Sequence, residues 1–371
     1  MVFRLTVRRI SCLGSICCIQ SSKEESQQME EGKGTQNSLN RLGKRSSIFF
    51  SNARVLLRRS GVLAQILSLA IIIAIFTIGT RGRYLSWDNI HVILSLAAIP
   101  AIYATGLHLT IVLGGIDLSV QGVASLCAVF VGILLQNQYN SNDVGLWIIP
   151  ISVAIGGVAG SISGILNTGL RIPSFMATLG MSWILYGLAV FLGKAVNVQI
   201  LDKRIENFIA ADFLGIPRIA IIAVVFAFIV QTVENRTRFG RYIYAIGGDE
   251  VIAKQAGINV RLIKIAVFTF AGAIYGLAAL LHTCQLGLAT SRMGLDILFP
   301  TITAVTVGGV ALTGGIGGAK NAVLGTLIVT ALNVGLVLMK VSPYIQQAVN
   351  GVVLIAAVAL TLDRKKLGFI K

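Results

Sequence analysis

Charged side chains are scarce in this chain of 371 residues, at 12% of the total, whereas 55% of the residues are hydrophobic. Soluble domains carry about 25% charged residues, so the composition excludes an ordinary soluble protein. Long runs of Ile, Leu, Val, Ala and Gly are separated only by short polar breaks. Because isolated strands leave backbone groups unsatisfied in lipid, these runs predict an all-α fold, a polytopic bundle of membrane-spanning helices.

Acidic side chains are the scarcest charged type, with 15 Asp and Glu against 31 Lys and Arg and a formal net charge of +16. Such an excess can indicate a nucleic-acid partner. Cytoplasmic loops of membrane proteins also collect Lys and Arg, and we favour this explanation, with no nucleic acid involved. Most of the basic residues fall in residues 1–60, in residues 234–264 and in the C-terminal tail. The distribution therefore predicts cytoplasmic N- and C-termini and a cytoplasmic loop at 234–264.

Cysteine and histidine are rare as well, with five and three residues. Cys12, Cys17 and Cys18 have no nearby histidine and are expected to be free thiols. Cys127 and Cys284 are expected to be packing residues. The sequence therefore predicts no disulfide framework, no metal site and no cofactor.

Hydropathy predicts about ten transmembrane helices, since each needs about 20 consecutive apolar residues. They are expected near residues 62–79, 91–113, 118–135, 146–166, 174–193, 217–233, 265–283, 297–313, 321–339 and 345–362. We expect a disordered basic cytoplasmic tail at 1–60, a transmembrane domain at 61–366 and a short cytoplasmic tail at 367–371. The first 60 residues contain no long apolar core and therefore no signal peptide, and Met29 is an alternative translation start to Met1.

One short polar stretch, DEVIAKQAG at residues 249–257, lies between two long apolar segments. Asp249 is placed to cap a helix at its N-terminus, and Gly257 is placed to end it. Glu250 lies in the first turn, where a negative charge suits the helix dipole. Two glycines before Asp249 predict a turn there. A compact cytoplasmic helix in an otherwise apolar protein indicates contact with a soluble partner.

The sequence GGIDLSV at residues 114–120 lies between the second and third predicted spans. A charged side chain at the bilayer centre costs about 2.5–3.5 kcal/mol, so Asp117 must face water, a partner helix or backbone donors. Gly115 permits a tight turn, and Asp117 or Ser119 can cap the next helix. These residues and Asn333 in the ninth span are candidates either for the transport path or for helix caps and interhelical hydrogen bonds.

Glycines recur at small-xxx-small spacing in two predicted spans. The fourth span contains Gly156, Gly160 and Gly164, and the seventh contains Gly272 and Gly276. Small residues at this spacing let helix backbones approach closely. The pattern therefore predicts tight helix packing rather than a binding site.

The chain is not expected to be an enzyme. The glycine-rich run GGVALTGGIGG at residues 308–318 is followed by Ala319 and Lys320, whereas a Walker loop requires Gly-Lys-Ser/Thr at its end. ATP hydrolysis would therefore require a separate subunit. His108 is expected to be a satisfied buried imidazole rather than a proton relay, because the spans offer no chain of acidic and histidine side chains.

Three motifs together resemble the permease subunits of ribose- and galactose-type ABC sugar importers. They are GGIDLSV at 114–120, GRYIYAIGGDEVIAKQAGINV at 240–260 and VGGVALTGGIGG at 307–318. The resemblance runs in order from about residue 60 to 366. It implies a multi-pass protein of the bacterial inner membrane that imports a monosaccharide or related polyol by alternating access, driven by ATP hydrolysis on another subunit.

The resemblance also implies three partners. These are a cytoplasmic ABC ATPase with two fused nucleotide-binding halves, an extracytoplasmic solute-binding protein, and a second permease copy or paralogue. In this family a short cytoplasmic helix docks in a groove of the ATPase. That role carries over to Asp249, Glu250, Ala253, Ala256 and Gly257. The binding protein is expected to dock on outer loops near 194–217 and 284–296.

The chain departs from the family pattern at several points, which leaves the substrate open. Gln121 intervenes before Gly122, Asn333-Val334 replaces the usual pair of asparagines, and Pro300 lies near the start of the eighth span. Alternative hypotheses are an ABC permease for nucleosides or branched-chain amino acids, a secondary transporter, and a membrane scaffold. A secondary transporter would need an ion pair or ion site inside the membrane.

Overall fold

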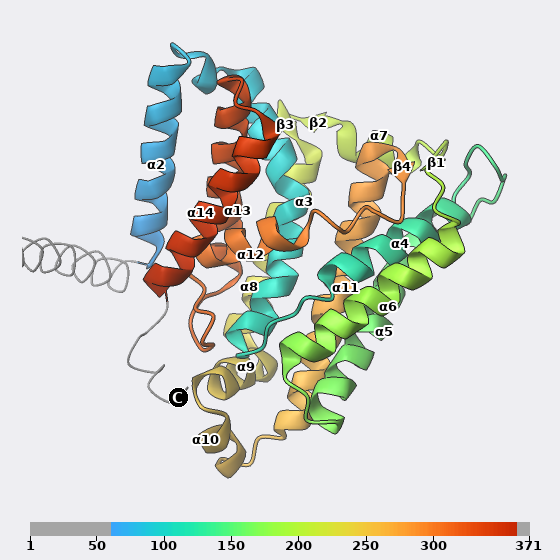
Figure 1. Cartoon of the computed structure of the whole chain (residues 1–371), viewed down its shortest axis with the longest axis vertical. Helices are drawn as coiled ribbons and strands as arrows, with labels where there is room; N and C mark the ends of the chain where they lie inside the picture. The colour runs from blue at the N-terminus through green and yellow to red at the C-terminus, as the bar shows by residue number, and fades with distance from the viewer. Residues whose placement is uncertain (1–60, 362–371) are drawn as a thin grey trace, which may run out of the picture. The chain divides into compact units, whose positions relative to one another are not determined.

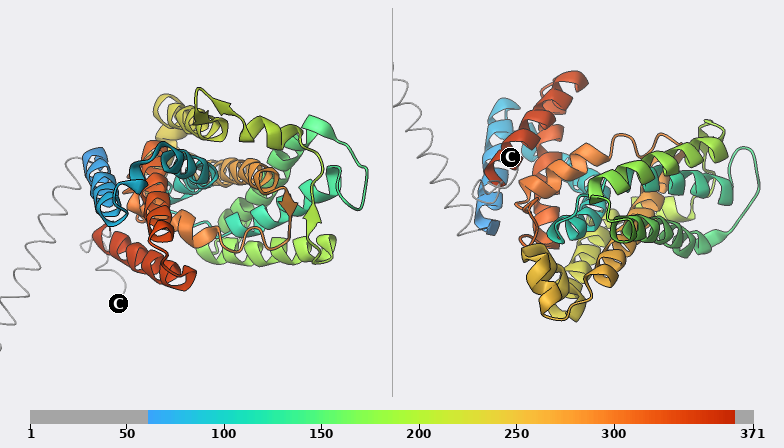
Figure 2. Two further views of the ribbon diagram at one scale, coloured as in Figure 1. Left: turned by 90° about the horizontal axis from the view of Figure 1, so that it is seen from above. Right: turned by 60° about the horizontal axis from the view of Figure 1, so that its bottom comes forward.

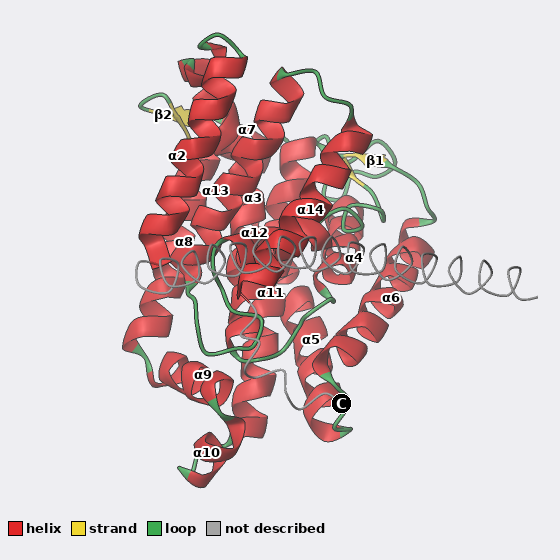
Figure 3. Ribbon diagram, turned by 60° about the vertical axis from the view of Figure 1, so that its left-hand side comes forward, coloured by secondary structure: helices red, strands yellow, loops and turns green. Residues whose placement is uncertain are grey.

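The computed structural model describes residues 61–361, which are mostly helical with very short strands (Figures 1 and 3). The helices are α2 (Gly61–Gly79), α3 (Trp87–Val112), α4 (Val120–Leu134), α5 (Ile148–Gly169), α6 (Ser174–Gly193), α7 (Arg204–Ala210), α8 (Arg218–Arg236), α9 (Arg238–Gly248), α10 (Glu250–Gln255), α11 (Val260–Leu286), α12 (Leu298–Val307), α13 (Ala319–Leu338) and α14 (Pro343–Thr361). Four two-residue strands are β1 (Val198–Gln199), β2 (Asp212–Phe213), β3 (Ile216–Pro217) and β4 (Leu288–Ala289). The all-α class is confirmed.

Seven of the described helices are long and apolar enough to cross a membrane, and α4, α12 and α14 are shorter apolar helices. The span predicted at 297–313 is wrong in length, because α12 ends at Val307 and the chain turns through Gly309 at φ +80°. Ten membrane crossings and cytoplasmic termini stay predictions. The tails expected at 1–60 and 367–371, and Met29, lie outside the described residues.

Helices α3 and α11 lie at the centre of the described bundle and pack against each other. The second half of α3 is buried, and so is most of α11 from Val267 onward. Helix α2 packs chiefly on α13, and α14 packs on α12 and α13, so both lie at one edge (Figure 2). Apolar side chains on α2 remain largely exposed, as expected for helices that face lipid.

The closest helix pair is α5 with α11, and glycine is the reason. A Cβ atom at Gly160 would overlap the carbonyl oxygen of Phe268, and one at Gly272 would lie 2.9 Å from the Cα atom of Gly160. Gly156 and Gly276 make equally close backbone contacts across the same pair. The predicted packing role of the glycine pattern is confirmed.

The two ends of the bundle carry different elements (Figure 1). Helices α9 and α10 lie at one end, and α7 and the short strands lie at the other. Strands β1 and β4 are antiparallel, with Val198 opposite Ala289, so they join the loop after α6 to the loop after α11. The loops expected to dock a binding protein therefore lie side by side, at the end of the bundle away from α10.

Candidate functional site

The local sequence around α10 produces a capped helix of six residues. Asp249 has extended backbone, and its Oδ1 accepts hydrogen bonds from the amides of Val251 at 2.9 Å and Ile252 at 3.0 Å. Gly257 follows the helix with φ +82°, a conformation that favours glycine. The predicted N-cap and terminator are confirmed. The glycine pair before Asp249 is not a turn, because it forms the last two residues of α9.

The outward face of α10 differs from the face that the sequence suggested. Val251 and Ile252 are 66% and 63% exposed, whereas Ala253 is 3% exposed and packs inward. Glu250 and Ala256 are exposed, and Glu250 pairs with Lys264 of α11 at 2.7 Å. Two adjacent large aliphatic side chains in a polar helix were visible in the sequence, but only the helix orientation shows that both face outward.

Backbone atoms from three segments meet just above α10. The amide of Gly315 donates to the carbonyl oxygen of Val112 at 2.8 Å. A Cβ atom at Gly247 would overlap that same carbonyl oxygen and lie 2.7 Å from the Gly315 nitrogen. A Cβ atom at Gly314 would lie 2.8 Å from the Gly247 carbonyl oxygen and 2.9 Å from the Cα atom of Gly114. The end of α3, the end of α9 and the loop at 308–318 therefore form one close junction.

The segment at 114–119 continues from this junction into the protein core. Asp117 is fully buried, and its Oδ1 accepts from the amide of Ser119 at 2.9 Å and from the Ser119 hydroxyl at 2.6 Å. Ser119 occupies the N-cap position of α4, but its side chain makes no cap hydrogen bond. Of the two capping candidates, Asp117 accepts a backbone amide at the start of α4, whereas the Ser119 side chain accepts none.

Two hydroxyl groups of α6 form hydrogen bonds with the segment at 114–119. The amide of Ile116 donates to the Ser174 hydroxyl, and the amide of Leu118 donates to the Thr178 hydroxyl, both at 3.0 Å. A Cβ atom at Gly115 would lie 3.4 Å from the Ser174 hydroxyl, so the turn passes close to α6. Asp117 and Gly115 thus belong to a corner between α3, α4 and α6, in which Oδ2 of Asp117 is buried and has no hydrogen-bond partner among the described residues.

A buried hydrogen-bonded pair, formed by His108 of α3 and Glu234 of α8, was missed from the sequence. His108 Nε2 lies 2.6 Å from Glu234 Oε1, with side-chain exposures of 0% and 1%. The other oxygen of Glu234 accepts from the amide of Ala319, the first residue of α13, at 3.0 Å. The predicted satisfied imidazole is confirmed only at Nε2 of His108, because its buried Nδ1 has no hydrogen-bond partner among the described residues. Glu234 was placed outside the sixth span, but α8 continues to Arg236 and carries it into the bundle.

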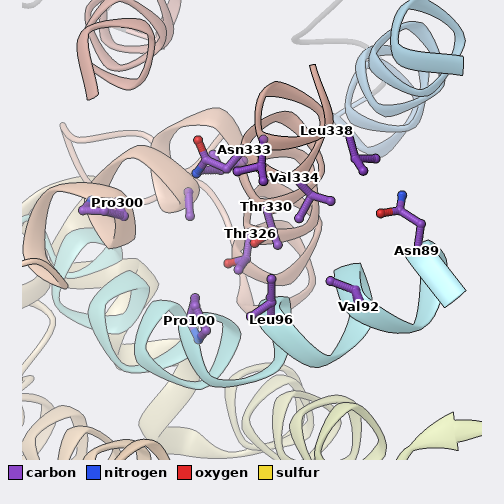
Figure 4. Close-up of a pocket in the computed structure, with 13 residues that line it drawn as sticks. Asn89, Val92, Leu96, Pro100, Pro300, Thr326, Thr330, Asn333, Val334 and Leu338 are labelled. Atoms are coloured by element: carbon purple, nitrogen blue, oxygen red, sulfur yellow. The ribbon is translucent and has the colours of Figure 1, made fainter. Parts of the chain in front are cut away.

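Asn333 lies elsewhere, in a cavity of about 480 Å³ between α3, α12 and α13 (Figure 4). Its lining is mostly apolar, with polar side chains only from Asn89, Thr326, Thr330 and Asn333. Oδ1 of Asn333 has no hydrogen-bond partner among the described residues. Within residues 61–361, no group of three or more His, Cys, Asp and Glu side chains could hold a metal ion.

Comparison with known proteins supplies the context for this geometry. A family described as branched-chain amino acid transport system / permease component matches residues 89–358. A galactose/methyl galactoside import permease of Salmonella typhimurium is 34% identical over 320 residues, 82% of this chain and 94% of that protein. A D-allose transport system permease of Escherichia coli is 33% identical over 292 residues, 79% and 89%. A ribose import permease of Haemophilus influenzae is 32% identical over 314 residues, 83% and 94%. No solved structure matches.

Proposed function

We propose a function for this chain, which belongs to the family of branched-chain amino acid transport system permease components. The chain is the transmembrane permease subunit of an ABC importer in the bacterial inner membrane. Its substrate is a monosaccharide or a related polyol. The observation that carries the substrate class is the 32–34% identity, over most of the chain, with galactose, allose and ribose permeases. Those relatives favour a sugar over a nucleoside or a branched-chain amino acid.

The ATPase drives this importer through contact with α10. A separate cytoplasmic ABC ATPase, with two fused nucleotide-binding halves, receives the exposed side chains of Val251 and Ile252 in a groove. Asp249 and Gly257 keep α10 short and rigid, and Glu250 ties it to α11 through Lys264. Replacement of Glu250 by Lys places two cations at this ion pair, and we expect uptake to fall while the protein remains in the membrane.

The opposite end of the bundle receives a solute-binding protein on the loops joined by β1 and β4. Exposed cations, including Lys194 and Arg292, lie in the chain segments on either side of this strand pair. Sugar then passes through the membrane part by alternating access, with a second permease copy or a paralogue completing the assembly. The mostly apolar cavity at Asn333 offers few hydrogen bonds to a sugar, which suits passage rather than capture.

The alternative of a secondary transporter would require an ion pair or ion site inside the membrane. His108 and Glu234 are buried in the bundle, but they form a hydrogen-bonded pair that an imidazole with its hydrogen on Nε2 satisfies. Both oxygens of Glu234 are already used within the protein, and the family consists of permease components, so we favour ATP-driven import.

The test is uptake by proteoliposomes that contain this chain, its ATPase and its binding protein. Radiolabelled ribose, galactose and allose are offered separately, with ATP or a non-hydrolysable analogue inside. We expect ATP-dependent uptake of a sugar that continues in the presence of an ionophore. Uptake that needs no ATP and collapses with the ionophore would instead establish the secondary transporter.

A further inference from the structure

Helix α13 begins without a cap of its own. Its N-cap residue is Gly318, which has no side chain, so the first amide groups of the helix need partners from elsewhere. Two side chains of α8 supply them. Glu234 Oε2 accepts from the amide of Ala319 and Gln231 Oε1 accepts from the amide of Lys320, both at 3.0 Å. Helix α8 therefore caps α13 through tertiary contacts.

The capping carboxylate is shared with α3. Glu234 Oε1 lies 2.6 Å from His108 Nε2, and both side chains are excluded from solvent. Nδ1 of His108 has no partner among the described residues, so an imidazole with its hydrogen on Nε2 satisfies the geometry. Loss of either donor would leave a buried carboxylate oxygen without a partner, which costs free energy. The Glu234 carboxylate therefore holds α3, α8 and α13 together.

The start of α13 is also bonded to α9, the helix that leads to α10. Helix α9 starts four residues after Glu234, at Arg238. Its Tyr244 hydroxyl donates to the carbonyl oxygen of Gly317 at 2.7 Å, just before α13 begins. Its Gly247 packs without clearance on Val112 and Gly315. Because these contacts leave no space at the junction, a displacement of α9 and α10 would be transmitted to the start of α13, the helix that carries Asn333.

From these contacts we propose that Glu234 is a positioning residue, which couples movement of α9 and α10 to α13 during transport. The proposal rests on the proposed function, because it needs an ATPase that moves α10. Glu234 touches neither sugar nor ATP in this role. It acts through the amide of Ala319 and the imidazole of His108, and its loss separates ATP hydrolysis from sugar movement.

The experiment measures sugar uptake per ATP hydrolysed by the complete complex in proteoliposomes. We compare Glu234→Ala with Glu234→Gln, which keeps an oxygen acceptor for the Ala319 amide. Tyr244→Phe removes only the hydroxyl that donates to the carbonyl oxygen of Gly317. This variant tests the link between α9 and α13 if Glu234→Ala fails to assemble. The control is Thr232→Ala on α8, because that hydroxyl bonds only within its own helix, to the carbonyl oxygen of Phe228.

Glu234→Ala leaves the Ala319 amide and Nε2 of His108 unpaired, so we expect less assembled complex. In the complex that assembles, we expect normal ATP hydrolysis with a loss of uptake per ATP of about tenfold or more, the range of one charged hydrogen bond. Glu234→Gln should recover part of the loss, Tyr244→Phe should lose less, and Thr232→Ala should match the wild type. Unchanged uptake per ATP in both Glu234→Ala and Tyr244→Phe would overturn the proposal. So would a loss of assembled complex that fully accounts for the loss of uptake. If the wild-type complex shows no ATP-driven uptake, the proposed function itself fails.

Discussion

The exposed pair on α10 gives the sharpest test of ATPase docking. Ile252 is 63% exposed, and a fully buried isoleucine side chain contributes about 1.5–3 kcal/mol. If docking buries the exposed two-thirds, Ile252 contributes about 1–2 kcal/mol to binding. Because about 1.4 kcal/mol corresponds to a factor of ten, Ile252→Ala should weaken ATPase binding about 5- to 30-fold.

The assay is surface plasmon resonance with the permease in nanodiscs and the purified ATPase in solution. The chain offers a matched control in Ile184 on α6, which is 64% exposed but lies within a predicted span. Ile184→Ala should leave the dissociation constant unchanged. The inference fails if Ile252→Ala binds within twofold of the wild type, or if Ile184→Ala weakens binding equally.

Three further predictions concern stability and uptake. Gly160→Ala should destabilise the protein by about 1–3 kcal/mol, because the added methyl group overpacks the contact with α11. Gly180 has open space around it, so Gly180→Ala should stabilise the protein by about 0.5–1 kcal/mol. Thermal unfolding in detergent measures both changes. Asp117→Ala leaves two buried donors unpaired, at about 1–3 kcal/mol each, and should lower both membrane protein level and uptake. Hydrogen bonds from Arg204 lower the pKa of Asp202. This pair therefore stabilises the fold above the usual carboxyl pKa, and the stabilisation is lost as pH falls through the lowered pKa. In Asp202→Asn, the melting temperature should lack this dependence on acidic pH.

Features that depend on neighbouring residues could be predicted from the sequence. Asp249 caps α10 because its carboxylate reaches amides two and three residues ahead, a contact that local geometry alone permits. Gly160 and Gly272 pack closely because small residues four apart make a flat helix surface. The sequence left open whether Asp117 or Ser119 caps the start of α4, and the structure shows that Asp117 accepts the Ser119 amide while the Ser119 hydroxyl donates to the same carboxylate.

Features that join distant segments could not be predicted in this way. Whether Ala253 or Ile252 faces outward depends on how α10 rests on the bundle. Glu234 appeared to be a loop residue because hydropathy locates the end of an apolar run, whereas the helix itself continues further. Its partner His108 is 126 positions away, and no pattern in the sequence links the two.

By itself, therefore, the sequence determined the membrane class, the capped helix at 249–257, the glycine packing and the family. Each follows from composition, from short-range spacing or from motifs. The tertiary structure alone decided which side chains of α10 are exposed, and how α3, α8 and α13 are bonded to one another at Glu234. The physical reason is that a buried carboxylate needs donors from whichever helices surround it, and only the packed bundle brings those helices together.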